Sequence, residues 1–318
     1  MKMKRLLIPA LVPMVVSVMT IVSQAQENLP RATKSGFVTT SDKVRIHYLE
    51  AGPRLTQRAS SGARSTRDSH SSPTILFVPG WMTPAWIWEH QMAHFSENHR
   101  VVAMDPRSQG ASSKPTEGHL PATRARDIKS VVDQLKLAPV VIVASTSAVT
   151  EAVSYVDQFG TATLAGLVLV NGIAGREYDE ATMSGLIAYS NSFQVDRNKA
   201  ADRFVRGLYK KPQSEDYIRR MVRATLQMPT NSALALIIGG IASDNRQALA
   251  KIDKPTLIVV ARVAPWMQFY EDLQKRIRAS RMEVFDDAGH ALFVDEPRRF
   301  NSLLDGFLSA LPPEPPNN

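Results

Sequence analysis

A continuous apolar run from Val140 ends in three adjacent hydroxyl-bearing residues: Ser145, Thr146 and Ser147. A hydroxyl becomes a nucleophile when a neighbouring base accepts its proton, and a neutral imidazole can accept that proton and return it to the leaving group. Of the seven histidines, His290 is the best candidate for this base, because it lies in an Asp-Ala-Gly-His turn after the last expected strand. A buried structural histidine is the alternative interpretation.

The residues around these hydroxyls predict a strand, a tight turn and a helix. The run from Val140 to Ala144 is typical of a buried parallel strand. After the hydroxyls, apolar residues return at helical spacing: Val149, Ala152, Val153 and Val156. The hydroxyls therefore lie in the turn between a strand and the helix that packs back on the sheet.

The rest of the chain alternates between strand and helix patterns with short connections. This alternation predicts a parallel, doubly wound α/β sheet with an antiparallel hairpin, residues 36–51, at one edge. Strands are expected at 74–80, 99–105, 140–145, 164–170, 254–261 and 281–285, and helices at 122–135, 271–278 and from Pro297.

Amphipathic helices between Gly172 and Asn245 interrupt this alternation and indicate an inserted helical cap, residues 172–245. Residues 53–73 are rich in Ser, Arg, Gly and Thr and predict a disordered surface loop. The core is then formed by residues 26–171 and 246–318.

The first 25 residues form a separate module. A basic start, an apolar stretch from Leu6 to Val22 and small residues up to Ala25 predict a secretory signal peptide, cut after Ala25. A retained membrane anchor is the alternative, disfavoured by Pro9 and Pro13. We therefore expect a periplasmic or secreted protein with no stable membrane anchor after cleavage.

Composition excludes several classes. With no cysteine, disulfides and thiol chemistry are absent. The formal charge of +8 comes mostly from the signal and the Arg-rich loop, so the folded body is close to neutral and nucleic acid is not an expected partner.

Five short motifs occur in a consistent order and spacing, and together they resemble the α/β-hydrolase superfamily. They are Val78-Pro-Gly-Trp81, Asp105-Pro-Arg-Ser-Gln-Gly-Ala-Ser112, Ala144-Ser-Thr-Ser-Ala148, Pro255-Thr-Leu-Ile-Val259 and Asp287-Ala-Gly-His-Ala291. Together with the stretch that leads from Asp244 to Pro255, these motifs look most similar to small-cap bacterial esterases and cofactor-free haloperoxidase-like enzymes. The resemblance implies the α/β-hydrolase fold with a helical cap, and no cofactor.

The resemblance places Thr146 at the nucleophile position, where serine is usual. The turn there holds a sparsely populated backbone conformation, which a β-branched residue adopts poorly, and Ala144 and Ala148 replace the usual glycines. Three interpretations follow. Thr146 is a specialised nucleophile, or Ser145 or Ser147 is the nucleophile in a relaxed turn, or hydrolysis has been lost.

The resemblance also implies a carboxylate partner for His290, and the expected turn after residues 255–260 reads Ala261-Arg-Val-Ala264 instead. At a second accepted position, after Val170, lies Asn171, which can orient an imidazole by hydrogen bonding. Glu271 is a weaker candidate for the acid, because it and Asp272 fit equally well in the first turn of a helix.

The oxyanion hole is expected to consist of the backbone N–H groups of Trp81 and Ser147. Aromatic and apolar side chains are expected to bind substrate, with ordinary helix packing as the equal alternative for those in the cap. These side chains are Trp81, Trp86, Met183, Tyr189, Phe204 and Met228.

His90 and His94 are four residues apart and would share one face of a helix, but the stretch lacks the glutamate of His-Glu-x-x-His and a third ligand. We therefore expect no metal. Asp105 and Arg107 are expected to fix their loop rather than to touch substrate.

Three hypotheses of function remain. The first is hydrolysis of small carboxylic esters or lactones with apolar groups, by attack of an elbow hydroxyl with His290 as base. The second is a catalytically degenerate protein that binds small molecules. The third is a lyase or cofactor-free oxygenase in which His290 is the base. Fold alone does not decide among them.

Overall fold

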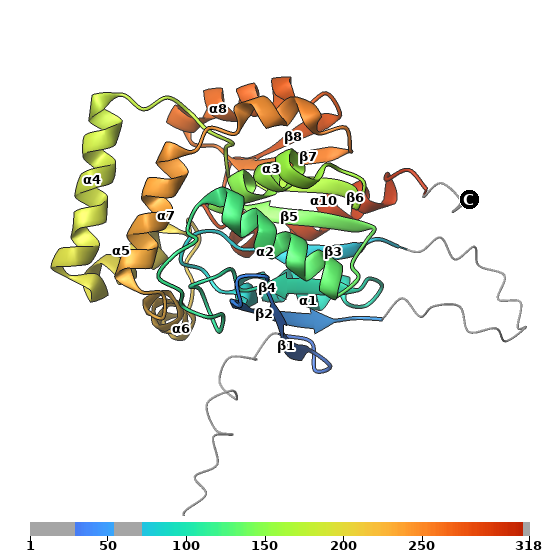
Figure 1. Cartoon of the computed structure of the whole chain (residues 1–318), viewed down its shortest axis with the longest axis horizontal. Coiled ribbons are helices and arrows are strands. Elements are labelled where there is room, and N and C mark those ends of the chain that lie inside the picture. The colour runs from blue at the N-terminus through green and yellow to red at the C-terminus, as the bar shows by residue number, and fades with distance from the viewer. Residues whose placement is uncertain (1–28, 54–71, 314–318) are drawn as a thin grey trace, which may run out of the picture.

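The computed structural model describes residues 29–53 and 72–313 (Figure 1). The expected signal peptide and nearly all of the expected loop at 53–73 lie outside these residues. In the described chain an eight-stranded sheet has the order β1-β2-β4-β3-β5-β6-β7-β8. The strands are β1 (Lys34–Thr39), β2 (Arg45–Ala51), β3 (Thr74–Val78), β4 (Val101–Met104), β5 (Val140–Ser145), β6 (Leu164–Val170), β7 (Thr256–Ala261) and β8 (Ser280–Phe285).

The sheet is antiparallel at one edge and parallel elsewhere. β1 pairs with β2 and β2 pairs with β4 in antiparallel register, whereas β4, β3, β5, β6, β7 and β8 are parallel neighbours. The predicted fold class, a doubly wound and mostly parallel sheet with an edge hairpin, is confirmed. β5, which precedes the candidate nucleophile, lies in the middle of the sheet.

Helices cover both faces of the sheet, as alternation along β5 requires. Ile142 and Ala144 pack toward one face, together with apolar residues of α2 (Pro121–Gln134), α3 (Ser147–Phe159), α8 (Ala264–Arg276) and the 3-10 helix η3 (Arg246–Lys251). Val141 and Val143 pack toward the other, with η2 (Ala85–Trp88), α1 (Glu89–Phe95), α9 (Leu292–Asp295) and α10 (Pro297–Ser309). Strands buried on both faces are continuously apolar for this reason.

Four helices are inserted between β6 and β7 and gather at one side of the sheet (Figure 1). They are α4 (Glu180–Val195), α5 (Arg197–Gly207), α6 (Glu215–Leu226) and α7 (Thr230–Ala242). The side chains of Asp179, Asp196 and Ser214 accept hydrogen bonds from N–H groups in the first turns of α4, α5 and α6. Such caps define where each helix begins.

The first and last residues of the helical insertion lie next to each other. The N–H of Asn245 donates to the carbonyl of Ala174 at 2.8 Å. The two ends of the insertion are therefore adjacent, although seventy residues of chain separate them.

The helix after β7 begins earlier than the sequence pattern predicts. α8 begins at Ala264, with Pro265 in its first turn, where the missing N–H of proline is not needed. Glu271 and Asp272 therefore lie well inside α8, and the expectation that they occupy a first turn is wrong. Asp272 accepts a hydrogen bond from Arg276, one turn further along.

Within residues 29–53 and 72–313, none of the helices has the length and apolar character that a membrane span requires.

Candidate active site

Thr146 occupies the sharp turn between β5 and α3. Its backbone has φ 54° and ψ −116°, a combination that residues other than glycine seldom adopt. The N–H of Thr146 donates to the carbonyl of Val170 at 2.8 Å, at the end of the neighbouring strand β6. The strained turn expected from the motif is therefore present, with a β-branched residue at its apex.

Two glycines leave the space that this turn occupies. A Cβ atom on Gly80 would lie 1.8 Å from Thr146 Oγ1, and one on Gly172 would lie 2.3 Å from the carbonyl oxygen of Thr146. Neither distance is compatible with a side chain. The Thr146 hydroxyl is thus held against the loop that follows β3.

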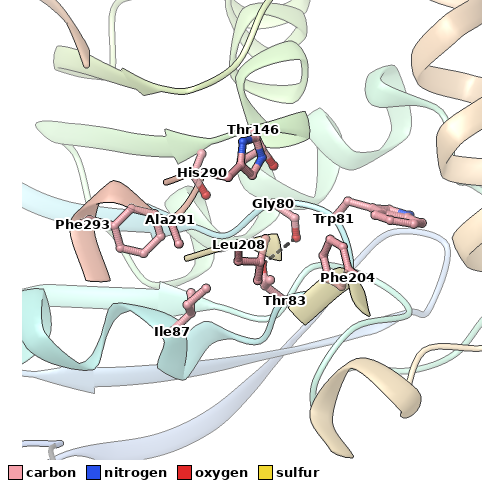
Figure 2. Close-up of a pocket in the computed structure, with 11 residues that line it drawn as sticks. Gly80, Trp81, Thr83, Ile87, Thr146, Phe204, Leu208, His290, Ala291 and Phe293 are labelled. Atoms are coloured by element: carbon pink, nitrogen blue, oxygen red, sulfur yellow. Dashed lines mark hydrogen bonds between the residues drawn. The ribbon is translucent and has the colours of Figure 1, made fainter. Parts of the chain in front are cut away.

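A small pocket of about 70 Å³ brings the candidate residues together. Figure 2 shows Thr146 and His290 at this pocket, with aromatic and aliphatic side chains around them. The lining residues are Gly80, Trp81, Thr83, Ile87, Ser145, Thr146, Phe204, Leu208, His290, Ala291 and Phe293. Three hydroxyl-bearing residues and an imidazole therefore share one largely apolar space.

His290 lies in the turn between β8 and α9, and its main chain is fixed on several sides. Asn171 Nδ2 donates to the carbonyl of His290 at 2.8 Å. The carboxylate of Asp295 accepts from the N–H of Gly289 at 2.7 Å, and the N–H of Ala291 donates to the carbonyl of Leu208 at 2.8 Å. The turn is anchored to β6 on one side and to the helical insertion on the other.

The imidazole of His290 is neutral at neutral pH. The residue is exposed within the pocket, yet the protein around the ring desolvates it and lowers its pKa from 6.5 to about 4. In the described chain the ring has no hydrogen-bond partner, and no carboxylate lines the pocket. His290 can accept a proton, but nothing at hand stabilises the imidazolium that would result.

Asn171 does not orient the His290 ring, contrary to one expectation. Its Oδ1 accepts from the N–H of Ala261 at 2.7 Å, while its Nδ2 bonds the carbonyl of His290. Asn171 itself has a positive φ of 47°. It therefore joins the ends of β6 and β7 to the histidine turn through main-chain atoms. Glu271 is exposed on α8 and does not line the pocket.

The two backbone N–H groups expected at the oxyanion hole have no hydrogen-bond partner among the described residues. Ser147 is the first residue of α3, so its N–H has no carbonyl partner within the helix. Trp81 follows Gly80 in the pocket wall, and its N–H meets no acceptor within residues 29–53 and 72–313. Ser147 is half-buried and does not itself line the pocket, whereas Ser145 does, at 2% exposure.

The predicted substrate-binding side chains divide into three groups. Trp81 and Phe204 line the pocket, with ring centroids 5.2 Å apart. Tyr189 packs behind Trp81, and Met228 is buried in the same apolar cluster. Trp86 contacts Tyr217 and lies under the guanidinium of Arg220, away from the pocket lining, and Met183 is half-buried on α4.

Sequence reasoning missed several lining residues. Ala291 and Phe293 directly follow His290, so their proximity to the base was available from the sequence. Thr83, Ile87 and Leu208 had no such signal, because an apolar residue that lines a pocket looks like one that fills a core.

The histidine at position 94 of the pair 90 and 94 has a carboxylate as its partner. His94 Nε2 lies 2.7 Å from Asp305 Oδ2 at the surface. Across the described ranges, no group of three or more potential ligands is close enough to hold a metal.

Asp105 fixes the loops at the carboxyl edge of the sheet. Its carboxylate accepts from the N–H groups of Ala85 and Ala111 and bonds the ring of His47 at 2.7 Å. Arg107 forms a buried two-point ion pair with Asp127, at 2.6 Å for both bonds. Asp105 and Arg107 both lie outside the lining of the pocket.

Comparison with known proteins adds sequence relatives to this geometry. A protein of Bacillus subtilis (strain 168) named "AB hydrolase superfamily protein YisY" is 28% identical over 257 residues, which cover 75% of this chain and 92% of that protein. The "Bifunctional esterase/perhydrolase DCH" of Acinetobacter calcoaceticus is 32% identical over 139 residues, covering 43% of this chain and 45% of the other.

A solved structure supports the fold over almost its whole length. The esterase EaEST from Exiguobacterium antarcticum superposes with a TM-score of 0.75 at 23% identity, over 86% of this chain and 99% of that one. The model of the "Alpha/beta hydrolase family" matches residues 75–303. Because this match runs from the first parallel strand to the last helix, the protein belongs to the alpha/beta hydrolase family.

Proposed function

We propose that the protein hydrolyses carboxylic esters or lactones with small apolar groups, with Thr146 as nucleophile and His290 as general base. The observation that carries the proposal is the placement of Thr146, at positive φ in the β5–α3 turn, in the same pocket as His290. A relative named as an esterase and perhydrolase supports the reaction class.

The chemistry follows from the groups present. Thr146 Oγ1 attacks the carbonyl carbon of the ester while His290 accepts the hydroxyl proton. The N–H groups of Trp81 and Ser147 bind the negative oxygen of the tetrahedral intermediate. His290 returns the proton to the departing alkoxide, and the acyl group stays on Thr146. A water molecule, deprotonated by His290, then attacks the acyl carbonyl. The bond to Thr146 Oγ1 breaks, His290 returns the proton to that oxygen, and the carboxylic acid is released.

The surroundings of His290 predict slow turnover. An imidazole without a carboxylate partner is a weaker base, and its protonated form in the transition state lacks a compensating charge. The pocket walls, mostly Ile87, Leu208 and Phe293 with Trp81 and Phe204, favour an apolar substrate. We further propose that residues 1–25 direct export, so that this reaction takes place in the periplasm or outside the cell.

A fluorophosphonate probe tests the nucleophile directly. Mature protein is labelled beside a serine esterase control, and the modified peptide is identified by mass spectrometry. An adduct on Thr146 that disappears in Thr146→Ala and persists in Ser145→Ala supports the proposal. An adduct on Ser145 or Ser147 assigns the nucleophile to that residue. An unmodified elbow peptide, with a fully labelled control, excludes acyl-enzyme chemistry.

A second function is favoured by the missing carboxylate at His290. A protein that binds small apolar molecules without turnover needs the pocket but no acid partner for the base. Calorimetric titration with small esters and their non-hydrolysable ether analogues separates the two functions. Equal affinity for both, without release of acid, identifies a binding protein. Turnover that survives Thr146→Ala and is lost in His290→Ala identifies a non-hydrolytic enzyme, once Ser145 and Ser147 are shown to be dispensable.

A further inference from the structure

A buried glutamine contacts the loop that carries one of the oxyanion donors. Gln109 is 1% exposed and lies in the turn after β4. Its Nε2 donates to the carbonyls of Gly80 at 2.9 Å and Thr83 at 2.8 Å. Its Oε1 accepts from the N–H of Met82 at 3.3 Å. We call residues 80–83 the oxyanion loop.

We propose that Gln109 is a positioning residue that sets the orientation of the Gly80–Trp81 peptide and so directs the Trp81 N–H into the pocket. The inference rests on the proposed function, which assigns that N–H to the oxyanion. A trans peptide is planar, with its N–H and C=O pointing in opposite directions. Gln109 Nε2 and the Thr83 hydroxyl both donate to the Gly80 carbonyl, and Figure 2 shows the bond from Thr83. Because the peptide is trans, the Trp81 N–H points to the side opposite this carbonyl.

The conformation of the oxyanion loop requires such support. Met82 has a positive φ of 60° although it is not a glycine, which costs free energy. The bond from its N–H to Gln109 Oε1 compensates for part of this cost. Without Gln109, the carbonyls of Gly80 and Thr83 lose a hydrogen-bond donor, and the N–H of Met82 loses its acceptor.

Arg124 fixes the orientation of the Gln109 amide from the side opposite the oxyanion loop. Arg124 Nη2 lies 3.4 Å from Gln109 Oε1, and a guanidinium only donates. The amide oxygen must therefore face Arg124, and the amide nitrogen must face the two carbonyls of the loop. Arg124 is held in turn by Glu151 of α3, at 2.6 Å. The chain from Glu151 through Arg124 to Gln109 thus connects the helix that follows Thr146 to the oxyanion loop.

Two variants remove the donated bonds in different ways. Gln109→Met keeps the length of the side chain without polar atoms, and Gln109→Glu keeps a group that pairs with Arg124 but cannot donate. Since loss of one oxyanion donor lowers kcat by about 10²–10³ and a misaligned donor by less, we expect kcat for a small ester to fall about 10–100-fold in both. KM should change less than about threefold, because the ground-state carbonyl depends little on this N–H.

Gln91→Met is the matched control. Gln91 is also fully buried, and its Nε2 also donates two bonds, to Phe293 O and Asn301 Oδ1, both at 3.0 Å. It should lose a similar amount of thermal stability with kcat unchanged. If Gln91→Met lowers kcat as much as Gln109→Met, the effect is a general loss of packing and the proposal is overturned.

A crystal structure of Gln109→Met decides the question without catalysis. A rotated Gly80–Trp81 peptide supports the assigned role, and a carbonyl that keeps its direction overturns it. A wild-type protein that hydrolyses no ester would count against the proposed function alone, while the peptide orientation in the variant still decides the role of Gln109.

Discussion

Thr146 combines a positive φ with a β-branched side chain, and the branched side chain raises the free-energy cost of that backbone conformation. Thr146→Ser keeps Oγ and removes the methyl group. We expect the free energy of unfolding of the variant to exceed that of the wild-type protein by about 1 kcal/mol, since strain of this kind costs roughly 1–3 kcal/mol. Ester turnover should rise, because the hydroxyl becomes less hindered. Urea denaturation and a steady-state assay measure the two effects.

Thr83→Ser is the matched control for that prediction. Thr83 also lines the pocket, is 4% exposed and lies outside the residues with positive φ. The same substitution there should lower stability slightly, since it removes a buried methyl group without relieving strain. A Thr146→Ser variant that is destabilised as much as Thr83→Ser would show that the turn at 146 is unstrained.

The lowered pKa of His290 fixes the pH dependence of the reaction. The base must be neutral, and desolvation by the surrounding protein lowers its pKa from 6.5 to about 4. We expect kcat/KM to stay constant as pH falls from 8 through 6.5 and to reach half its value near pH 4. A pH–rate profile, with circular dichroism to confirm folding at each pH, measures it. An acid limb near 6.5 would show that the ring has its ordinary pKa.

The same shift affects stability in a defined direction. The unfolded chain binds the proton of His290 more tightly than the folded chain does, so this residue destabilises the fold as pH decreases from 6.5 toward 4. His290→Gln should flatten that part of the curve of unfolding free energy against pH.

At the scale of elements, local patterns predicted most of the fold. Continuous apolar runs predicted β5, β6 and β7, and the switch to helical spacing after Ser147 predicted α3. These signals depend on neighbours in the sequence. The start of α8 was missed because arginine and valine precede Ala264 without a capping side chain, and the main-chain role of Asn171 was missed because its partner His290 lies 119 residues away.

The candidate site was predictable from the sequence only where its residues belong to motifs at strand ends. The positions of Thr146 and His290 follow from motifs at strand ends, since those ends meet at one edge of a parallel sheet. Gln109 gave no signal, because its three partners lie 26 to 29 residues away in a loop without regular structure. Tertiary contacts of this kind cannot be read from periodicity.

The carboxylate of Asp295 joins the turn between α5 and α6 to the histidine turn. Asp295, 7% exposed, accepts from the N–H groups of Gly289 at 2.7 Å, Lys210 at 2.8 Å and Lys211 at 3.3 Å. Asp295→Ala leaves these donors without an acceptor. We expect it to lower the unfolding free energy by roughly 1–3 kcal/mol and to reduce turnover, since the His290 turn loosens.

Asp305→Ala provides the comparison. Asp305 bonds His94 at 2.7 Å, with both side chains exposed, so its loss should cost below about 1 kcal/mol and leave turnover unchanged. Thermal denaturation and ester assays of the two variants measure the difference. Equal effects would mean that Asp295 has no special part in holding the two turns together.

For the whole molecule, the proposed signal predicts where the protein accumulates and where the mature chain begins. Expressed in a bacterium, the full chain should appear in the periplasmic fraction with Gln26 as its first residue. Cell fractionation and N-terminal sequencing measure this. Ala25→Leu should block cleavage and leave the longer form, because a small residue is needed at the cut. Recovery of uncut wild-type protein in membranes would support an anchor instead.

The adjacent ends of the helical insertion have a consequence for how such proteins diversify. Because Ala174 and Asn245 are joined by a hydrogen bond, the chain between them is a module that can be exchanged while each strand keeps its neighbours. The module supplies Phe204 and Leu208 to the pocket, whereas Thr146 and His290 lie in turns that follow strands of the sheet. One part of the pocket wall is thus encoded in a stretch of the gene separate from both candidate catalytic residues, so a change in that stretch alters the wall while Thr146 and His290 stay as they are.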